Sequence, residues 1–136
     1  MNPTKIILTK FLMLALAGAA GTLARYGIST LTHKLFAGVF PWGTFAVNML
    51  GCLFFGLVWS LTESRLIIAG EMRLIVLVGF MGAFTTFSTF AFESAHMLRT
   101  EQWALALINL TVQNIVGVIL ILLGLKLVLR YVYNEG

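Results

Sequence analysis

Charged residues divide this chain into four long uncharged segments, which cover residues 11–24, 35–62, 74–92 and 102–125. The first segment is short, but the chain beyond Arg25 stays uncharged as far as His33. The third continues past Glu93 toward Met97 in the same way. Since an α-helix needs about 20 apolar residues to cross the ~30 Å hydrocarbon core of a bilayer, the pattern predicts four membrane-spanning helices.

We expect one all-α integral membrane domain over residues 1–136, with helices at approximately residues 8–31, 41–62, 73–97 and 102–126. Gly38, Pro41 and Gly43 indicate a connector that leads into the second helix, because proline suits a first helical turn. The polar stretch 62–73 predicts a surface loop, and residues 98–102 predict a tight turn. A fifth helix has no room, and an even number of spans places both termini on one side of the membrane.

The start of the chain is compatible with two interpretations. Lys5 and Lys10, followed by the apolar run 11–17 and several small residues, resemble a cleavable signal peptide. Against cleavage, the uncharged pattern continues through Gly18 to Arg25 without a turn signal. We therefore interpret this segment as a retained first membrane helix.

The composition supports a membrane protein and excludes several other classes. Hydrophobic residues make up 60% and charged residues 10% of the chain, whereas soluble domains carry about 25% charged residues. The net charge of +4 does not indicate nucleic-acid binding, because the nine basic residues are scattered rather than clustered. The single cysteine, Cys52, provides neither a disulfide framework nor a cysteine-based zinc site.

The basic residues are distributed unevenly between the two sides of the membrane. Six are expected on the side of the termini (Lys5, Lys10, Arg65, Arg73, Lys126 and Arg130) and three on the other (Arg25, Lys34 and Arg99). The positive-inside rule therefore mildly favours cytoplasmic termini.

The third uncharged segment contains the most informative polar residues. Residues 79–93 (GFMGAFTTFSTFAFE) place glycines and hydroxyl groups in the middle of the span, where such residues accommodate a helix break. A break frees backbone carbonyls, which coordinate cations in other membrane proteins. The spacing of Phe84, Phe87 and Phe90 predicts that they share one face. The alternative is a plain packed helix, with its hydroxyl groups bonded to carbonyls one turn earlier.

Polar residues at helical spacing also mark the second and fourth segments. Thr44, Asn48, Gly51, Cys52 and Phe55 share a face of the second, and Asn109, Gln113 and Gly117 share a face of the fourth. A single stripe of this kind is typical of helix–helix hydrogen bonding, worth about 1–2 kcal/mol or less in bilayers. Stripes on three helices favour a shared polar path.

The charged and titratable residues near the ends of the spans leave several roles open. Arg25 is compatible with snorkelling to the interface or with attracting anions to a vestibule. Glu93 is expected to pair with Arg25 or with a polar group on another helix. His33 and His96 are expected at the membrane interface, without metal-ligand spacing. The chain has no hydrolase, zinc-protease or Walker motif, so we expect neither an enzyme nor an ATP-driven pump.

Three segments of the sequence resemble the Fluc (CrcB) family of fluoride channels, which are small four-helix bacterial membrane proteins. They are residues 21–26 (GTLARY), 43–51 (GTFAVNMLG) and 79–93, in the family's order. The TTFSTF run followed by Glu93 is the most specific of them. The resemblance covers most of the chain.

The resemblance implies a passive, fluoride-selective channel in the bacterial inner membrane that lowers cytoplasmic fluoride. Its implied pore residues are Asn48, Thr86, Phe87, Ser88 and Phe90, with Asn109 and Gln113 as possible polar lining and Arg25 at the vestibule. A phenylalanine ring has a positive edge, so edge-on rings can replace part of an anion's hydration. Conduction requires sites that are weak enough to leave, which a buried cationic side chain would not provide.

The resemblance also implies an antiparallel, dual-topology homodimer with two pores, each built from both subunits. The backbone carbonyls of Gly82 and Thr85 are implied to hold a central structural sodium ion, which is not transported. Two features depart from the family pattern. Dual topology favours a balanced count of basic residues, and Gly117 stands where relatives commonly have a hydroxyl group.

Two other functions are compatible with a four-helix membrane protein of this length. A small multidrug transporter would require a carboxylate in the first helix, where this chain has Arg25 and no acidic residue. An accessory subunit would use its polar stripes only to hold helices together. Loss of flux with preserved assembly on substitution of Phe87 or Phe90 would distinguish a channel from such a subunit.

Overall fold

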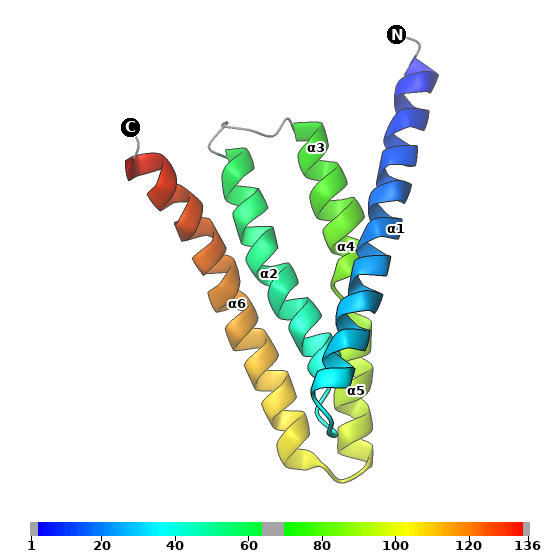
Figure 1. Ribbon diagram of the computed structural model, residues 1–136, viewed down its shortest axis with the longest axis vertical. Helices are drawn as coiled ribbons and strands as arrows, with labels where there is room; N and C mark the ends of the chain where they lie inside the picture. The colour runs from blue at the N-terminus through cyan, green and yellow to red at the C-terminus, as the bar shows by residue number, and fades with distance from the viewer. Residues whose placement is uncertain (1–2, 64–69, 135–136) are drawn as a thin grey trace.

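Residues 3–63 and 70–134 are described by the computed structural model, and in these two ranges the regular structure is entirely helical (Figure 1). The elements are α1 (Pro3–Leu35), α2 (Trp42–Glu63), α3 (Gly70–Leu74), η1 (Ile75–Met81), α4 (Gly82–Phe84), α5 (Phe87–Arg99) and α6 (Trp103–Asn134). Half of the loop expected at residues 62–73, namely residues 64–69, lies outside the described residues, whereas residues 62–63 and 70–73 are helical.

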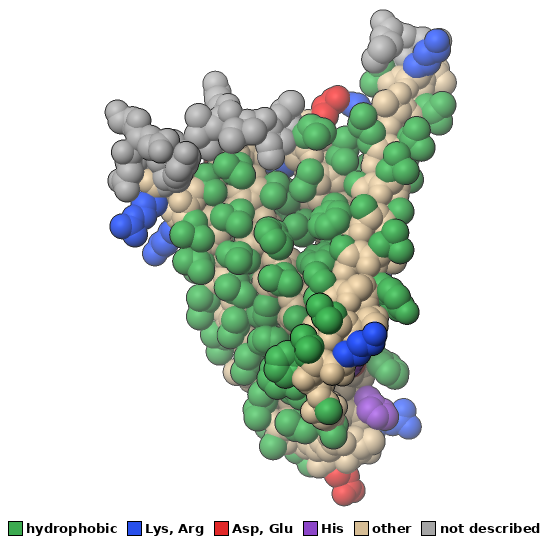
Figure 2. All heavy atoms as spheres, viewed as in Figure 1, with side chains coloured by type: hydrophobic (Ala, Val, Ile, Leu, Met, Phe, Trp, Pro, Cys, Tyr) green, Lys and Arg blue, Asp and Glu red, His purple; other side chains and the backbone are tan. Residues whose placement is uncertain are grey.

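Within the two described ranges, four helical segments are long and apolar enough to cross a membrane, which confirms the predicted number of spans. They are Thr4–Leu35, Trp42–Glu63, Gly70–Arg99 and Trp103–Arg130. The two termini lie at the same end of the molecule (Figure 1). Hydrophobic side chains cover most of the visible face, and charged side chains gather toward its two ends (Figure 2). This distribution matches a protein whose middle lies in hydrocarbon.

Glycines allow the helices to approach one another closely. The helix α2 packs along α6, and a Cβ atom at Gly124 would lie 2.6 Å from the carbonyl oxygen of Leu53. The helix α1 packs along η1 and α4, where a Cβ atom at Gly21 would collide with the carbonyl of Phe80. Small residues at helix interfaces let backbones approach in this way in membranes.

The third span is composite rather than one regular helix. Its first half contains the π-helical segment η1, which leads into the short α4. Extended backbone at Thr85 and Thr86 then separates α4 from α5, so the predicted break is present near the middle of the span. The π-helical segment was not predicted from the sequence, and its wider hydrogen-bonding pattern is often found at functional sites.

The prediction that three phenylalanines share one face is wrong for Phe84. Because the break lies between Phe84 and Phe87, the two residues are on separate helical segments. Phe84 is buried in the core with Val47 and Met81, whereas Phe87 is 79% exposed. Helical spacing holds only where the helix is continuous, and here it is not.

The predicted turn between the third and fourth spans is present at residues 100–102. Glu101 adopts a left-handed conformation with φ 61°. The N–H of Gln102 donates to the carbonyl of Met97 at 2.9 Å, and the N–H of Glu101 donates to the carbonyl of Leu98 at 3.3 Å. These bonds form a Schellman-type end for α5, which reverses the chain into α6.

Candidate functional site

The break in the third span is the centre of the candidate site. Thr85 has φ −80° and ψ 160°, and Thr86 has φ −147° and ψ 108°, so neither residue is helical. The side chain of Thr86 caps α5, because its Oγ1 accepts from the N–H of Thr89 at 3.2 Å. Threonine is among the preferred residues for capping a helix N-terminus, which explains why the helix restarts here.

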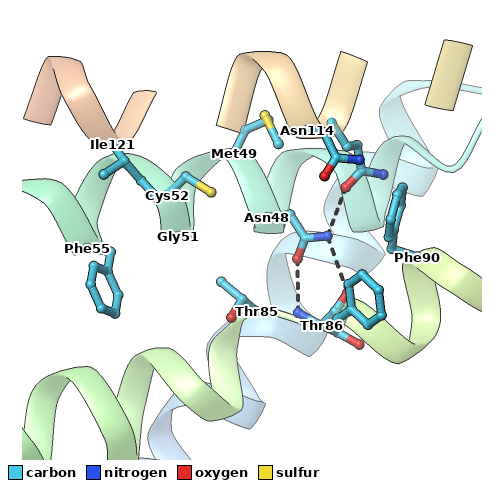
Figure 3. Close-up of a pocket in the computed structure, with 12 residues that line it drawn as sticks. Asn48, Met49, Gly51, Cys52, Phe55, Thr85, Thr86, Phe90, Asn114 and Ile121 are labelled. Atoms are coloured by element: carbon cyan, nitrogen blue, oxygen red, sulfur yellow. Dashed lines mark hydrogen bonds between the residues drawn. The ribbon is translucent and has the colours of Figure 1, made fainter. Parts of the chain in front are cut away.

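Asn48 on α2 holds the backbone of Thr86 in place. Its Oδ1 accepts from the N–H of Thr86 at 2.9 Å, and its Nδ2 donates to the carbonyl of Thr86 at 3.3 Å. Figure 3 shows this amide pointing from α2 toward the break. The side chain thus replaces helical partners that the extended backbone has lost, and buried peptide groups need such partners.

At least two backbone carbonyls lose their usual helical donors at the break. In a continuous helix the carbonyl of Gly82 would accept from the N–H of Thr86, and that of Thr85 from the N–H of Thr89. Instead, the N–H of Thr86 donates to Asn48 and the N–H of Thr89 donates to the hydroxyl of Thr86. The oxygens of Gly82 and Thr85 are therefore released from the helical pattern.

A cavity of about 260 Å³ lies beside the break, between α2, α5 and α6 (Figure 3). Its lining comprises Asn48, Met49, Gly51, Cys52, Phe55, Thr85, Thr86, Phe87, Phe90, Gln113, Asn114 and Ile121. The rings of Phe87 and Phe90 are 5.7 Å apart at 55° to one another. Phe87 is largely exposed and Phe90 is 6% exposed, so the pair extends from the surface to the buried side of the cavity.

The cavity's polar wall continues into the protein through hydrogen bonds. The Nδ2 of Asn48 donates to Gln113 Oε1 at 2.9 Å, and Gln113 Nε2 donates to Asn109 Oδ1 at 2.8 Å. The Nδ2 of Asn109 then donates to Ser94 Oγ at 2.9 Å. The wall is therefore fixed by contacts among three helices, α2, α5 and α6.

A second hollow, of about 270 Å³, lies next to α1. Its lining residues are Thr22, Arg25, Tyr26, Ser29, Thr44, Thr86 and Thr89. Arg25 is the cationic residue among them. Thr86 lines both hollows, so both lie next to the helix break.

Glu93 pairs with a polar group on another helix, which was one of its two expected partners. The hydroxyl of Thr44 donates to Glu93 Oε1 at 2.8 Å. The other carboxylate oxygen, Oε2, is buried and has no hydrogen-bond partner among the described residues. The alternative pairing of Glu93 with Arg25 is not found within the described ranges, where the recorded ion pair is Lys10–Glu71 at 2.6 Å.

The structure collects most, but not all, of the predicted site residues around one cavity. The predicted residues that line the cavity are Asn48, Thr85, Thr86, Phe87, Phe90 and Gln113. Three others are absent from its lining, namely Gly82, Ser88 and Asn109. Arg25 lines the second hollow instead.

Sequence reasoning missed four residues at this site. Met49, Asn114 and Ile121 line the cavity, and Ser94 ends the hydrogen-bonded chain behind it. Asn114 directly follows Gln113, which belongs to the polar stripe of the fourth segment, so its position could have indicated that it lies at the site. The other three carry no polar spacing pattern that would have singled them out.

Comparison with known proteins gives a consistent result. The family described as CrcB-like protein, Camphor Resistance (CrcB), matches residues 12–125 of the chain. A Nitrosococcus oceani protein named "Fluoride-specific ion channel FluC" is 56% identical over 85% of this chain and 92% of its own length. Proteins of the same name from Maridesulfovibrio salexigens and Nitratidesulfovibrio vulgaris (strain Miyazaki F) are 54% and 49% identical, over 87% and 85% of this chain and 94% of each relative.

Proposed function

This chain belongs to the CrcB-like protein family, and we propose that it conducts fluoride passively out of the bacterial cell along the cavity between α2, α5 and α6. It is a fluoride-specific ion channel and a multi-pass protein of the bacterial inner membrane. The observation that carries the route is the meeting of an aromatic pair and a polar helix break in one cavity.

The cavity suits an anion that must lose water without being trapped. Phe87 and Phe90 line it, and the edge of a phenylalanine ring carries a partial positive charge that attracts anions weakly. Asn48 and Gln113 place amide groups in the same lining, and the N–H groups of Asn48 are held there by bonds to Thr86 and Gln113. Among the described residues no Lys or Arg lines this cavity, so fluoride meets sites that it can leave, as conduction requires.

We assign the second hollow to the approach of the ion. Arg25 supplies a positive charge there, and a charged cleft raises the local concentration of oppositely charged ions. Thr86 is common to both hollows, which supports passage of the ion past the break. Ser88 is exposed on α5 two residues from Thr86, where it would add a hydroxyl group to the same route.

We further propose that the carbonyls of Gly82 and Thr85 hold a structural sodium ion. Both oxygens have lost their helical donors, and released carbonyls at the end of a half-helix are typical sodium ligands in membrane proteins. A bound sodium ion would supply a fixed positive charge near the fluoride route. Since one chain offers two such oxygens, a second copy would complete a set of four.

The exposed surface of the broken span supports an antiparallel homodimer. Gly82, Phe87, Ser88 and Thr89 are all exposed near the middle of the third span. Polar groups facing hydrocarbon are costly, so those found within a span almost always face protein or water. A second copy of this chain, packed here in the opposite orientation, would cover them and build the other side of each pore.

Fluoride efflux from liposomes that contain the full-length protein tests the proposed function. A fluoride electrode would record release after the potassium gradient is opened with valinomycin, with protein-free liposomes and chloride-loaded liposomes as controls. We expect fast fluoride release and little chloride release. Folded protein that releases no fluoride, or that releases both anions at similar rates, would contradict the proposal.

A further inference from the structure

A directed chain of side-chain hydrogen bonds connects two backbone groups of the broken span. It starts at the N–H of Thr86, which donates to Asn48. It continues through Gln113 and Asn109 to Ser94. The hydroxyl of Ser94 closes it by donating to the carbonyl of Phe90 at 2.8 Å. Every link donates in the same direction, from the break toward the phenylalanine pair.

Both N–H donors of the Asn48 amide are already used in the structure. The two N–H bonds of Nδ2 are directed to the carbonyl of Thr86 at 3.3 Å and to Gln113 Oε1 at 2.9 Å. An amide nitrogen has two hydrogens, so neither is free for an anion in this arrangement. A fluoride ion that binds Asn48 must replace one of these acceptors, and the longer bond, to Thr86, is the weaker one.

The two residues at the far end of the chain do not touch the cavity. Asn109 is 0% exposed and Ser94 is 3% exposed, and neither belongs to the cavity lining. Their hydrogen bonds therefore act only on other protein groups. Because Asn109 Nδ2 donates to Ser94 Oγ, Asn109 Oδ1 points to Gln113 and accepts from its Nε2. Gln113 Oε1 therefore points the other way and accepts from Asn48 Nδ2.

We propose that Ser94 and Asn109 are positioning residues for the fluoride route, which fix the Asn48 amide through Gln113 without contacting the ion. This inference rests on the proposed function. While fluoride replaces the carbonyl of Thr86 as an acceptor, the bond to Gln113 keeps the amide oriented. Loss of Ser94 or Asn109 frees Gln113 to rotate, and the Asn48 donor then loses its fixed direction.

The test measures the rate and the extent of fluoride efflux separately, at a protein density of about one channel per liposome. The extent reports the fraction of liposomes that hold an active channel, and the rate reports conduction by each channel. We expect Ser94→Ala and Asn109→Leu each to slow efflux roughly three- to tenfold, the loss typical of one buried hydrogen bond, at an unchanged extent. The double variant should be no slower than the slower single variant, because residues of one network are not additive.

Ser60→Ala provides a matched control. Ser60 is as buried as Ser94, at 1% exposed, and its hydroxyl also donates to a helix carbonyl, that of Leu125 at 3.2 Å. It lies outside the hydrogen-bonded chain and the cavity lining, so its loss should leave the efflux rate unchanged.

Three results would overturn the positioning role. They are a Ser94→Ala rate equal to that of the unaltered protein, a loss of extent without a loss of rate, and a double variant slowed by the product of the two single factors. Absence of efflux from the unaltered protein is a distinct result, because it would contradict the proposed function itself.

Discussion

Thr86 takes part both in the helix break and in the walls of the two hollows. Its backbone N–H and carbonyl bond to Asn48, and its hydroxyl caps α5. Its hydroxyl also donates to Thr89 Oγ1 at 2.8 Å. Because the same residue lines both hollows, the groups that end one helical segment and begin the next also form the wall of the proposed ion route.

The aromatic pair gives a prediction with an internal control. Phe87→Ile removes the ring edge while keeping an apolar side chain, so we expect fluoride efflux to fall more than about tenfold, a loss near 1.4 kcal/mol of ion stabilisation. Phe92 lies on the same helix and is similarly exposed, at 71%, but does not line the cavity. Phe92→Ile should leave efflux unchanged in the same liposome assay. Equal effects at the two positions would argue against a specific role for Phe87.

At the scale of elements, the third span works because a regular helix is interrupted twice. The π-helical segment η1 and the break at residues 85–86 lie within one membrane crossing. Asn48 and Thr86 help the bilayer tolerate the break, because they accept from the N–H groups of Thr86 and Thr89 that the helix no longer pairs. Close packing of α1 against η1 and α4 covers one side of the first half of the span.

The approach of α2 to the break predicts a sharp difference between two glycines. A Cβ atom at Gly51 would collide with the methyl group of Thr85, whereas a Cβ atom at Gly27 would meet nothing within 4 Å. Gly51→Ala should therefore destabilise the protein by about 1–3 kcal/mol, as overpacking does, and slow fluoride efflux. Thermal unfolding in detergent and liposome efflux would measure the two effects.

Gly27→Ala is the matched variant, because both glycines lie within helices. Alanine is favoured over glycine in a helix interior by up to about 1 kcal/mol, so this variant should be at least as stable as the unaltered protein. If Gly51→Ala were equally stable and equally active, the break would not depend on its contact with α2.

The proposed sodium ion predicts a dependence of stability on the cation present. A ligand that binds only the folded state, present at a concentration a hundred times its Kd, stabilises that state by about 2.7 kcal/mol. We therefore expect the melting temperature in sodium chloride to exceed that in N-methylglucamine chloride at equal ionic strength. Potassium chloride serves as a control for simple salt effects. Identical melting in all three salts would contradict a sodium ion at Gly82 and Thr85.

At the scale of the whole molecule, one chain leaves its polar break partly uncovered. Ser88 and Thr89 are exposed on α5 within the third span, and hydrocarbon cannot satisfy their hydroxyl groups. The uneven distribution of basic residues opposes insertion in both orientations, whereas burial of this polar surface by an inverted copy favours it. Orientation in the cell depends on which of these two effects is stronger.

Cysteine labelling in intact cells would measure that balance. Ala37 is exposed in the connector between α1 and α2, so Ala37→Cys in a Cys52→Ser background introduces a reporter without changing the charge. Dual topology predicts that a membrane-impermeant maleimide labels about half of the protein from outside, and the rest after permeabilisation. Fluoride efflux by the Cys52→Ser protein checks that the background is intact. Labelling of all or none from outside would instead establish a single orientation.

The sequence by itself determined the membrane class, the number of spans and the position of the break. These follow from local properties, namely uncharged segments of sufficient length and a run of glycine and hydroxyl residues in the third of them. The motifs at residues 21–26, 43–51 and 79–93 together also indicated the family. The sequence did not show that Phe84 and Phe87 lie on different faces, because helical spacing cannot show where a helix is interrupted.

Only the tertiary structure decided which groups meet. The bonds of Asn48 join residues 38 and 65 positions apart, and Glu93 pairs with Thr44 across 49 positions. Local spacing places a side chain on a helix face but carries no information on the rotation of that face toward another helix. The role of Ser94 shows the consequence, since its hydroxyl reaches the cavity wall only through side chains that α2 and α6 bring to α5.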